Sequence, residues 1–84
     1  MNPRVVAVTP QDGHALLLCF SNGERRQMNV RPYLAYKVFE RLRDPGFFAL
    51  AQADHGTVNW PGGIDPDPDS IYLESVPIPQ GATV

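Results

Sequence analysis

Two apolar segments near the start of the chain predict paired β-strands. The first is "RVVAV" (4–8), which is rich in β-branched residues, and the second is "HALLLCF" (14–20), which follows an Asp-Gly turn. The next turn, "SNGE" (21–24), contains Asn-Gly, a pair typical of two-residue type I′ turns because both residues tolerate a positive φ. Residues 24–30 should therefore pair with 14–20 and complete a three-stranded antiparallel meander.

A two-residue turn also fixes which residues lie opposite each other. It predicts that Phe20 lies opposite Arg25, and that Leu18 lies opposite Gln27 on the same, mixed face. The other face would be fully apolar away from the turn and is the predicted core side; it gathers Ala15, Leu17, Cys19, Met28 and Val30, with Arg26 near the turn. The mixed face, with Leu16, Leu18 and Phe20, is then either covered by another part of the chain or offered to a partner.

Helical spacing appears in the middle of the chain. From Tyr36 onward, apolar residues recur at the spacing of a short amphipathic helix; they are Val38, Phe39 and Leu42. Asp44 can then cap a further helix of one or two turns, with Pro45 in its first turn.

Two short extended segments and a last helix are predicted in the second half. "QADHGTVNW" (52–60) reads as two strands broken near Gly56, with Val58 and Trp60 pointing the same way. Asp67 before Pro68 is a helix start, and the acidic residues of the first turn suit the helix dipole.

Together these elements predict a small α+β fold, in which an antiparallel sheet begins with the meander and short helices lie in the middle of the chain and near its C-terminus. A chain of 84 residues makes one domain, which we place at residues 1–76. Residues 77–84 contain two prolines and a glycine without a periodic face, so we expect a flexible C-terminal tail.

Composition adds the class of protein. Hydrophobic residues at 43% and charged residues at 19% are ordinary for a soluble globule. The longest apolar run, "ALLLCF", is far shorter than the roughly 18 residues that a membrane-spanning helix needs. The first ten residues also lack the basic start and apolar core of an export signal. We therefore expect a cytoplasmic protein that makes no membrane contact.

Charge is divided unevenly along the chain. Residues 1–43 carry all seven cations against three acidic residues, a net charge of +4, whereas residues 44–84 carry six acidic residues and no cation, a net charge of −6. This polarity favours electrostatically guided contacts with proteins over the coating of nucleic acid.

The spacing of Asp65, Asp67 and Asp69 resembles the start of a calcium-binding loop. Such a loop requires Gly at its sixth position and Glu at its twelfth, where this chain has Ser70 and Val76. We therefore expect helix capping here and no metal site.

The remaining polar candidates are equally sparse. His14, His55 and Cys19 are too few and too scattered for a structural zinc site. Asp54 and His55 are neighbours, but strand neighbours point to opposite faces, so no acid–base pair is expected. Cys19 lies in an apolar run and is expected to be a buried, unreactive thiol.

Trp60 has two interpretations. Tryptophan is enriched in binding hot spots, and an exposed Trp60 would be an anchor for a partner. In so small a domain, however, the largest apolar side chain is usually needed in the core, and we favour that interpretation.

Five segments of the chain resemble a bacterial family catalogued as domain of unknown function 2442. They are "PRVVAV", "LLLCFSNGE", "RPYL", "VFERLRDPGFF" and "HGTVNWPGGIDPDPDSIYLES", and their order covers about residues 3–75. The resemblance implies an α+β domain. It also implies an association with small two-gene units of toxin-antitoxin type, and it supplies no established catalytic residues.

We therefore expect a small, non-enzymatic module for protein interaction or regulation that needs no cofactor. The expected partner is a protein, such as the product of an adjacent gene. A homodimer that binds nucleic acid is the first alternative, and a small-molecule sensor or enzyme built around Trp60, His55 and the aspartates is the second. The predicted contact surface joins the mixed sheet face to the basic side of the middle helix; its residues are Leu16, Leu18, Phe20, Arg25, Lys37 and Arg41.

Overall fold

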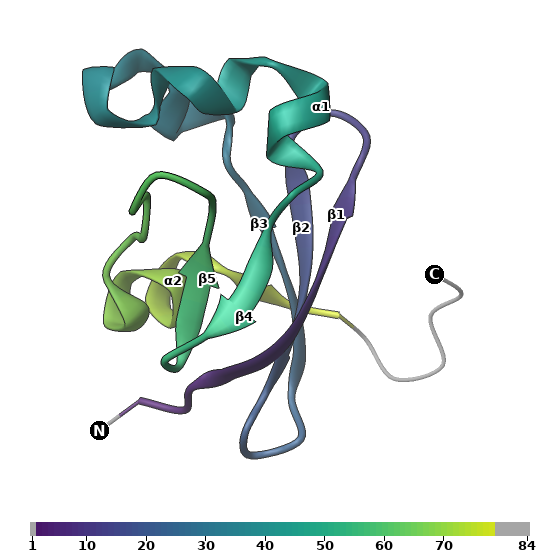
Figure 1. Cartoon of the computed structure of the whole chain (residues 1–84). Coiled ribbons are helices and arrows are strands. Elements are labelled where there is room, and N and C mark those ends of the chain that lie inside the picture. Colours follow the sequence, from purple (N-terminus) through teal and green to yellow (C-terminus); the bar gives the residue numbers. More distant parts are fainter. Residues whose placement is uncertain (1, 79–84) are drawn as a thin grey trace.

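The computed structural model describes residues 2–78, and it shows the α+β fold that the sequence predicts (Figure 1). Three strands are followed by three short helices, a pair of strands, a further helix and a last short strand. In order they are β1 (Val5–Gln11), β2 (Ala15–Phe20), β3 (Arg25–Asn29), the 3-10 helices η1 (Arg31–Ala35) and η2 (Lys37–Arg43), α1 (Pro45–Phe48), β4 (Gln52–Asp54), β5 (Thr57–Asn59), α2 (Pro68–Glu74) and β6 (Val76–Pro77).

The main sheet is antiparallel, with the strand order β1-β2-β3-β6. Strands β4 and β5 form a separate hairpin beside β1, where the Val5 amide donates to the Gly56 carbonyl at 3.1 Å. The N-terminal meander is therefore confirmed, and β6 is an addition that the sequence did not predict.

One hydrophobic core joins the sheet to the other elements. The buried apolar residues come from both sheets, from the helices η2, α1 and α2, and from the segments after β3 and β5; they are Val5, Leu16, Leu18, Phe20, Met28, Val30, Leu42, Phe48, Val58, Trp60, Ile64 and Ile71. Trp60 is 3% exposed, and its Nε1 donates to the Phe48 carbonyl at 2.9 Å. The interpretation of Trp60 as a core residue is confirmed, as is the shared direction of Val58 and Trp60.

The β2–β3 hairpin differs from its predicted register by one residue. Leu18 lies opposite Arg26, not Gln27, and Cys19 lies opposite Arg25. The turn is a three-residue loop, in which Phe20 donates to the Glu24 carbonyl and accepts from the Gly23 amide, each at 2.9 Å. Within this turn only Gly23 has a positive φ, which is typical of a type I turn followed by a left-handed glycine rather than a type I′ turn.

A one-residue shift moves every side chain of a strand to the other face. The predicted core side of β2 is therefore wrong: Leu16, Leu18 and Phe20 are at most 2% exposed, and they form the inner face with Met28. The residues of β2 that were predicted to face the core, Ala15, Leu17 and Cys19, are only half-buried and lie on the opposite face.

The middle of the chain forms two 3-10 helices in place of the predicted amphipathic α-helix. Leu42 is buried as predicted and Phe39 packs against the core, but Val38 is 66% exposed. The two predicted helix caps are confirmed: the Asp44 side chain accepts from the Phe47 amide at 2.9 Å, and that of Asp67 from the Ser70 amide at 3.0 Å.

The β4–β5 hairpin turns at His55 and Gly56, which have φ values of 51° and 78°. His55 therefore belongs to a two-residue turn and not to a strand. As a consequence its Nδ1 lies 3.1 Å from Asp54 Oδ2, and the expectation that these neighbours point apart is wrong.

The predicted flexible tail begins inside the sheet. Pro77 lies opposite Arg26, and the Ile78 amide donates to the Arg25 carbonyl at 2.9 Å, so these two residues are not a loose extension. The turn after α2 brings residues 76–78 alongside β3. The sequence of this segment has no periodic pattern from which the pairing could be predicted. Residues 79–84 of the predicted tail lie outside the described residues.

Candidate functional site

The main sheet has a second face, opposite the core, which we call the outer face. Alternation along each strand and the observed pairing place one set of residues on it. They are Ala7, Thr9 and Gln11 of β1, Ala15, Leu17 and Cys19 of β2, Arg25, Gln27 and Asn29 of β3, and Val76 of β6. The face carries apolar side chains and uncharged polar ones, with a single charge at Arg25.

The outer face keeps apolar surface accessible. Val76 is 59% exposed, and Leu17 lies half-buried in the same cross-strand row, two strands away. Cys19 is also half-buried, so its thiol is less enclosed than the sequence predicted. The central strand β2 is therefore apolar on this face, and its side chains remain within reach of another molecule.

A groove of about 360 Å³ opens at one end of this face. Its lining residues are Gly13, Ala15, Gln27, Asn29, Arg31 and Val76. Apart from apolar surface, they present one guanidinium and two amides, and no carboxylate. The groove therefore carries one positive charge, no negative charge, and amides that can both donate and accept hydrogen bonds.

Local geometry holds two of these donors in place. The Arg31 amide donates to Asn29 Oδ1 at 3.1 Å, which fixes the bend from β3 into η1. The Nη2 atom of Arg31 lies 3.5 Å from the point where a Cβ atom on Gly13 would sit, which places the guanidinium beside the turn between β1 and β2. Gln27 Nε2 donates to Gln11 Oε1 at 3.4 Å across the outer face.

The predicted contact surface is not assembled. Leu16, Leu18 and Phe20 belong to the core, because the register shift turns them inward, and they cannot meet a partner in the folded protein. The sequence left open whether these residues are covered by another part of the chain or face a partner. The structure shows that the chain itself covers them. Half of the predicted residues are thereby removed from the site.

The three predicted basic residues are separated. Arg25 lies on the outer face next to the β2–β3 turn, at the end of the molecule far from η2, which carries Lys37 and Arg41 (Figure 1). The Arg41 guanidinium packs over the Phe47 ring at 4.2 Å from its centroid. Arg41 thus contributes to internal packing, and only Arg25 belongs to the outer face.

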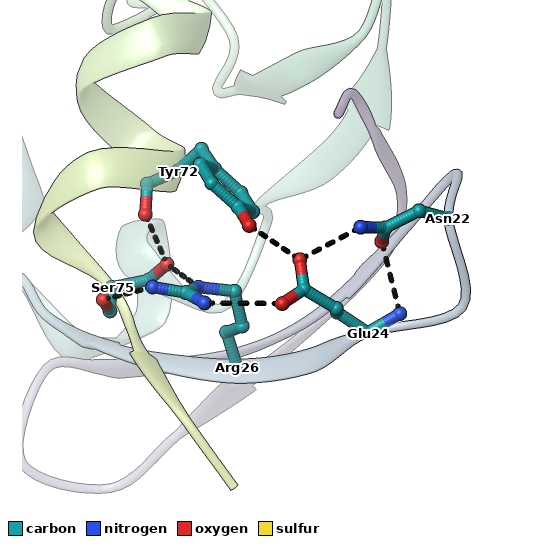
Figure 2. Close-up of polar contacts among 5 residues, drawn as sticks. All are labelled: Asn22, Glu24, Arg26, Tyr72 and Ser75. Atoms are coloured by element: carbon teal, nitrogen blue, oxygen red, sulfur yellow. Dashed lines mark hydrogen bonds and ion pairs between the residues drawn. The ribbon is translucent and has the colours of Figure 1, made fainter. Parts of the chain in front are cut away.

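A polar cluster fastens α2 and β6 to β3, and Figure 2 shows its five members: Asn22, Glu24, Arg26, Tyr72 and Ser75. Arg26 donates from Nε to Ser75 Oγ at 2.6 Å and from Nη2 to the Ser75 carbonyl at 2.8 Å. Its Nη1 lies 3.4 Å from Glu24 Oε1, and its Cζ lies 4.4 Å from the centre of the Tyr72 ring. We call these five residues the β3–α2 cluster.

Hydrogen bonding in the β3–α2 cluster shifts two pKa values. Tyr72 donates to Glu24 Oε2 at 2.6 Å and Asn22 donates to the same oxygen at 2.8 Å, which lowers the pKa of Glu24. The same bond raises the pKa of Tyr72, because its hydroxyl donates to a carboxylate. The cluster therefore favours the charged glutamate and the neutral tyrosine.

Ser75 is 3% exposed and fully engaged. Its Oγ accepts from Arg26 and donates to the Tyr72 carbonyl at 2.7 Å. These bonds end α2 and direct the chain into β6, which places Val76 at the edge of the outer face. The cluster thus positions the site rather than forming one.

The sequence held only one signal of the β3–α2 cluster. It placed Arg26 on the core side of β3, where a charged side chain needs polar partners. Those partners, Tyr72 and Ser75, lie 46 and 49 residues further along the chain, beyond the reach of any local pattern.

The residues of the predicted sensor or enzyme site do not converge on a metal. Trp60 is buried in the core, whereas the His55 side chain is 87% exposed in its turn. Within residues 2–78 there is no group of three or more His, Cys, Asp or Glu residues that could hold a metal ion. No helix in this part of the chain is long and apolar enough to cross a membrane.

Comparison with known proteins places the chain in a family. Neither a curated protein nor a solved structure matches it significantly. Residues 5–77, which include every strand and helix of the fold, match the family model described as "Protein of unknown function (DUF2442)". The resemblance noted from the sequence is thus confirmed, and the protein belongs to the DUF2442 family.

Proposed function

We propose that this protein is a small, non-enzymatic interaction module that binds a partner protein through the outer face. The observation that carries the proposal is the accessible apolar surface of Leu17, Cys19 and Val76 on the central and edge strands. Apolar side chains that stay accessible in the middle of a sheet, with polar residues around them, are typical of protein-binding surfaces.

The architecture supports this use of the outer face. The helices pack against the core on the inner side of the sheet. The outer face is therefore presented on a rigid scaffold. The β3–α2 cluster fixes β6 against β3 and so holds Val76 in place. A partner would therefore meet a preformed surface, which lowers the entropy cost of binding.

The partner that we propose is the product of a neighbouring gene, and this protein would be the antitoxin-like or regulatory member of a two-gene unit. The support for this finer statement is the family resemblance described above, combined with an accessible face suited to a protein.

The test is affinity capture from a lysate of the native host after nuclease treatment, read by mass spectrometry. The wild type is compared with Val76→Asp, which places a charge on the outer face at a position that is 59% exposed. Val38→Asp is the matched control, because Val38 is 66% exposed on η2, away from the outer face.

We expect wild type and Val38→Asp to recover the same stoichiometric protein, and Val76→Asp to lose it while remaining folded. Equal recovery by both variants would place the binding site elsewhere. Loss of every partner on nuclease treatment would favour a nucleic-acid-binding protein instead.

A further inference from the structure

We propose that the groove on the outer face binds an acidic segment of the partner, with one carboxylate at Arg31 and a second at Arg25. This inference rests on the proposed function, since it names the chemistry of the partner at the same face. Three observations support it: the residues that line the groove, the absence of an ion pair at Arg25 and Arg31 among the described residues, and edge strands that are poorly suited to pairing.

The groove offers a ligand one positive charge, two side-chain amides that can each donate and accept hydrogen bonds, and no negative charge. Arg31, Gln27 and Asn29 line it together with the apolar surface of Ala15 and Val76. An arginine binds a carboxylate through two parallel hydrogen bonds, and amide groups can bind its remaining lone pairs. A carboxylate flanked by apolar side chains is the ligand that complements this lining.

Arg25 and Arg31 differ from the other arginines of the sheet and helices. Arg26 is bound by Glu24 and Ser75, Arg41 packs on Phe47, and Arg43 Nε donates to the Leu34 carbonyl at 3.0 Å. Among the described residues, no carboxylate forms an ion pair with Arg25 or with Arg31. These two exposed cations are thus available to a partner.

The positions of Arg25 and Arg31 also set the spacing of the two carboxylates that a partner segment would need. Arg25 is the first residue of β3, and Arg31 lies two residues past the end of that strand. Since a strand rises about 3.3 Å per residue, the two positions are at most about 20 Å apart along the sheet. An extended partner segment spans that distance with acidic residues roughly six positions apart, and its apolar residues would then face Leu17 and Val76.

The edges of the sheet favour docking on the face over the addition of a strand. One edge strand, β1, contains Pro10 and an irregular register between Val5 and Ala7. The other, β6, has only two residues, of which one is Pro77. Proline lacks the amide that a new strand would need, and bulges and short edge strands are features that block edge pairing.

The experiment is selection of a displayed library of random 12-residue peptides on wild-type protein, followed by affinity measurement of the enriched peptides on single charge reversals. Arg31→Glu and Arg25→Glu change the proposed contacts. Lys37→Glu is the matched control, since it makes the same change of charge on an exposed residue of η2.

We expect enriched peptides with two acidic positions up to about six residues apart and apolar residues between them. Their affinity should fall about tenfold or more in Arg31→Glu and Arg25→Glu, because attraction becomes repulsion at a partly desolvated contact. Lys37→Glu should change it less than about twofold, and added salt should weaken binding to wild type.

Failure to enrich peptides, enrichment without acidic residues, or equal effects of Arg31→Glu and Lys37→Glu would overturn the inference. So would a fluorescently labelled 20-base-pair DNA duplex that binds wild type and is released by Arg31→Glu, because the groove would then bind phosphate. If Val76→Asp loses the captured host protein while Arg31→Glu and Arg25→Glu retain it, this inference falls and the proposed function stands.

Discussion

At the scale of single residues, Arg26 shows how one buried charge can organise distant parts of a small fold. Its side chain is only 11% exposed on the inner face of β3, where an unpaired guanidinium would be costly. Ser75 and Glu24 satisfy it, and the Tyr72 ring covers it. The contacts that offset the cost of burying Arg26 therefore also join β3 to α2 and β6.

Replacing Arg26 by methionine keeps the aliphatic length but removes every donor. We expect the free energy of unfolding to fall by about 2 kcal/mol, the range for hydrogen bonds that involve a charged group. Urea denaturation measures it, and Arg25→Met, on the exposed outer face, should change stability by less than about 0.5 kcal/mol. Equal effects of the two substitutions would mean that the contacts of Arg26 add nothing to stability.

Glu24 makes the stability of the protein depend on pH. Its pKa lies below the ordinary value of 4.5, chiefly because Tyr72 donates to it. The folded state therefore favours the carboxylate, and the Glu24 contribution is complete above pH 4.5 and is lost as pH falls through the lowered pKa. The pKa of Tyr72 is raised, so the folded state favours its neutral form. Its contribution to the free energy of unfolding is therefore complete below pH 10.0 and is lost as pH rises through the raised pKa.

The difference in the free energy of unfolding between wild type and Glu24→Gln should therefore shrink between about pH 6 and about pH 3. Urea denaturation across this range is the measurement, and Glu40→Gln, at an exposed position of η2, is the control. A difference that stays constant with pH would show that the bonds to Glu24 do not select its charged form.

At the scale of elements, the β2–β3 turn decides the faces of the sheet. The sequence correctly predicted the hairpin and its turn residues, because Asn-Gly and the flanking apolar runs are strong local signals. It predicted a two-residue loop, whereas the structure has a three-residue loop. That difference shifts the register by one and exchanges Leu18 with Leu17 on the inner face.

The caps and breaks of the second half were easier to predict. Asp44 and Asp67 act through hydrogen bonds to amides three residues away, so the sequence contains the whole motif. The outer-face groove and β6 depend instead on where α2 ends relative to β3, which only the packed structure determines. Of the six residues of the predicted contact surface, Arg25 is the one that lies on the outer face.

Gly23 tests the observed loop. Its φ of 88° lies in the left-handed region, and no atom lies within 4 Å of where a Cβ would be, so Gly23→Ala probes backbone conformation alone. We expect a loss of about 1 kcal/mol or more in the free energy of unfolding. Gly46→Ala, at a position in α1 without a positive φ, should be close to neutral or stabilising. An equally neutral Gly23→Ala would contradict the three-residue loop.

At the scale of the whole molecule, one face of the main sheet packs on the core and the other is the proposed binding face. The inner face packs against core residues of β5, η2, α1 and α2, whereas the outer face keeps accessible apolar groups, Arg25 and the groove beside Arg31. The acidic residues that dominate the second half of the chain lie elsewhere, with Asp67 and Asp69 at the start of α2. Of the cations in the first half of the chain, Arg25 lies on the outer face and Arg31 lines its groove.

This separation depends on β2 directing Leu18 inward and Leu17 outward, and a pair of substitutions tests it most directly. We expect Leu18→Asp, at a fully buried position, to unfold the protein, because it buries an unpaired charge in the core. Leu17→Asp should leave a cooperative urea transition and a native near-ultraviolet circular dichroism spectrum. A folded Leu18→Asp together with an unfolded Leu17→Asp would contradict the account and would return the apolar contact surface to Leu16, Leu18 and Phe20.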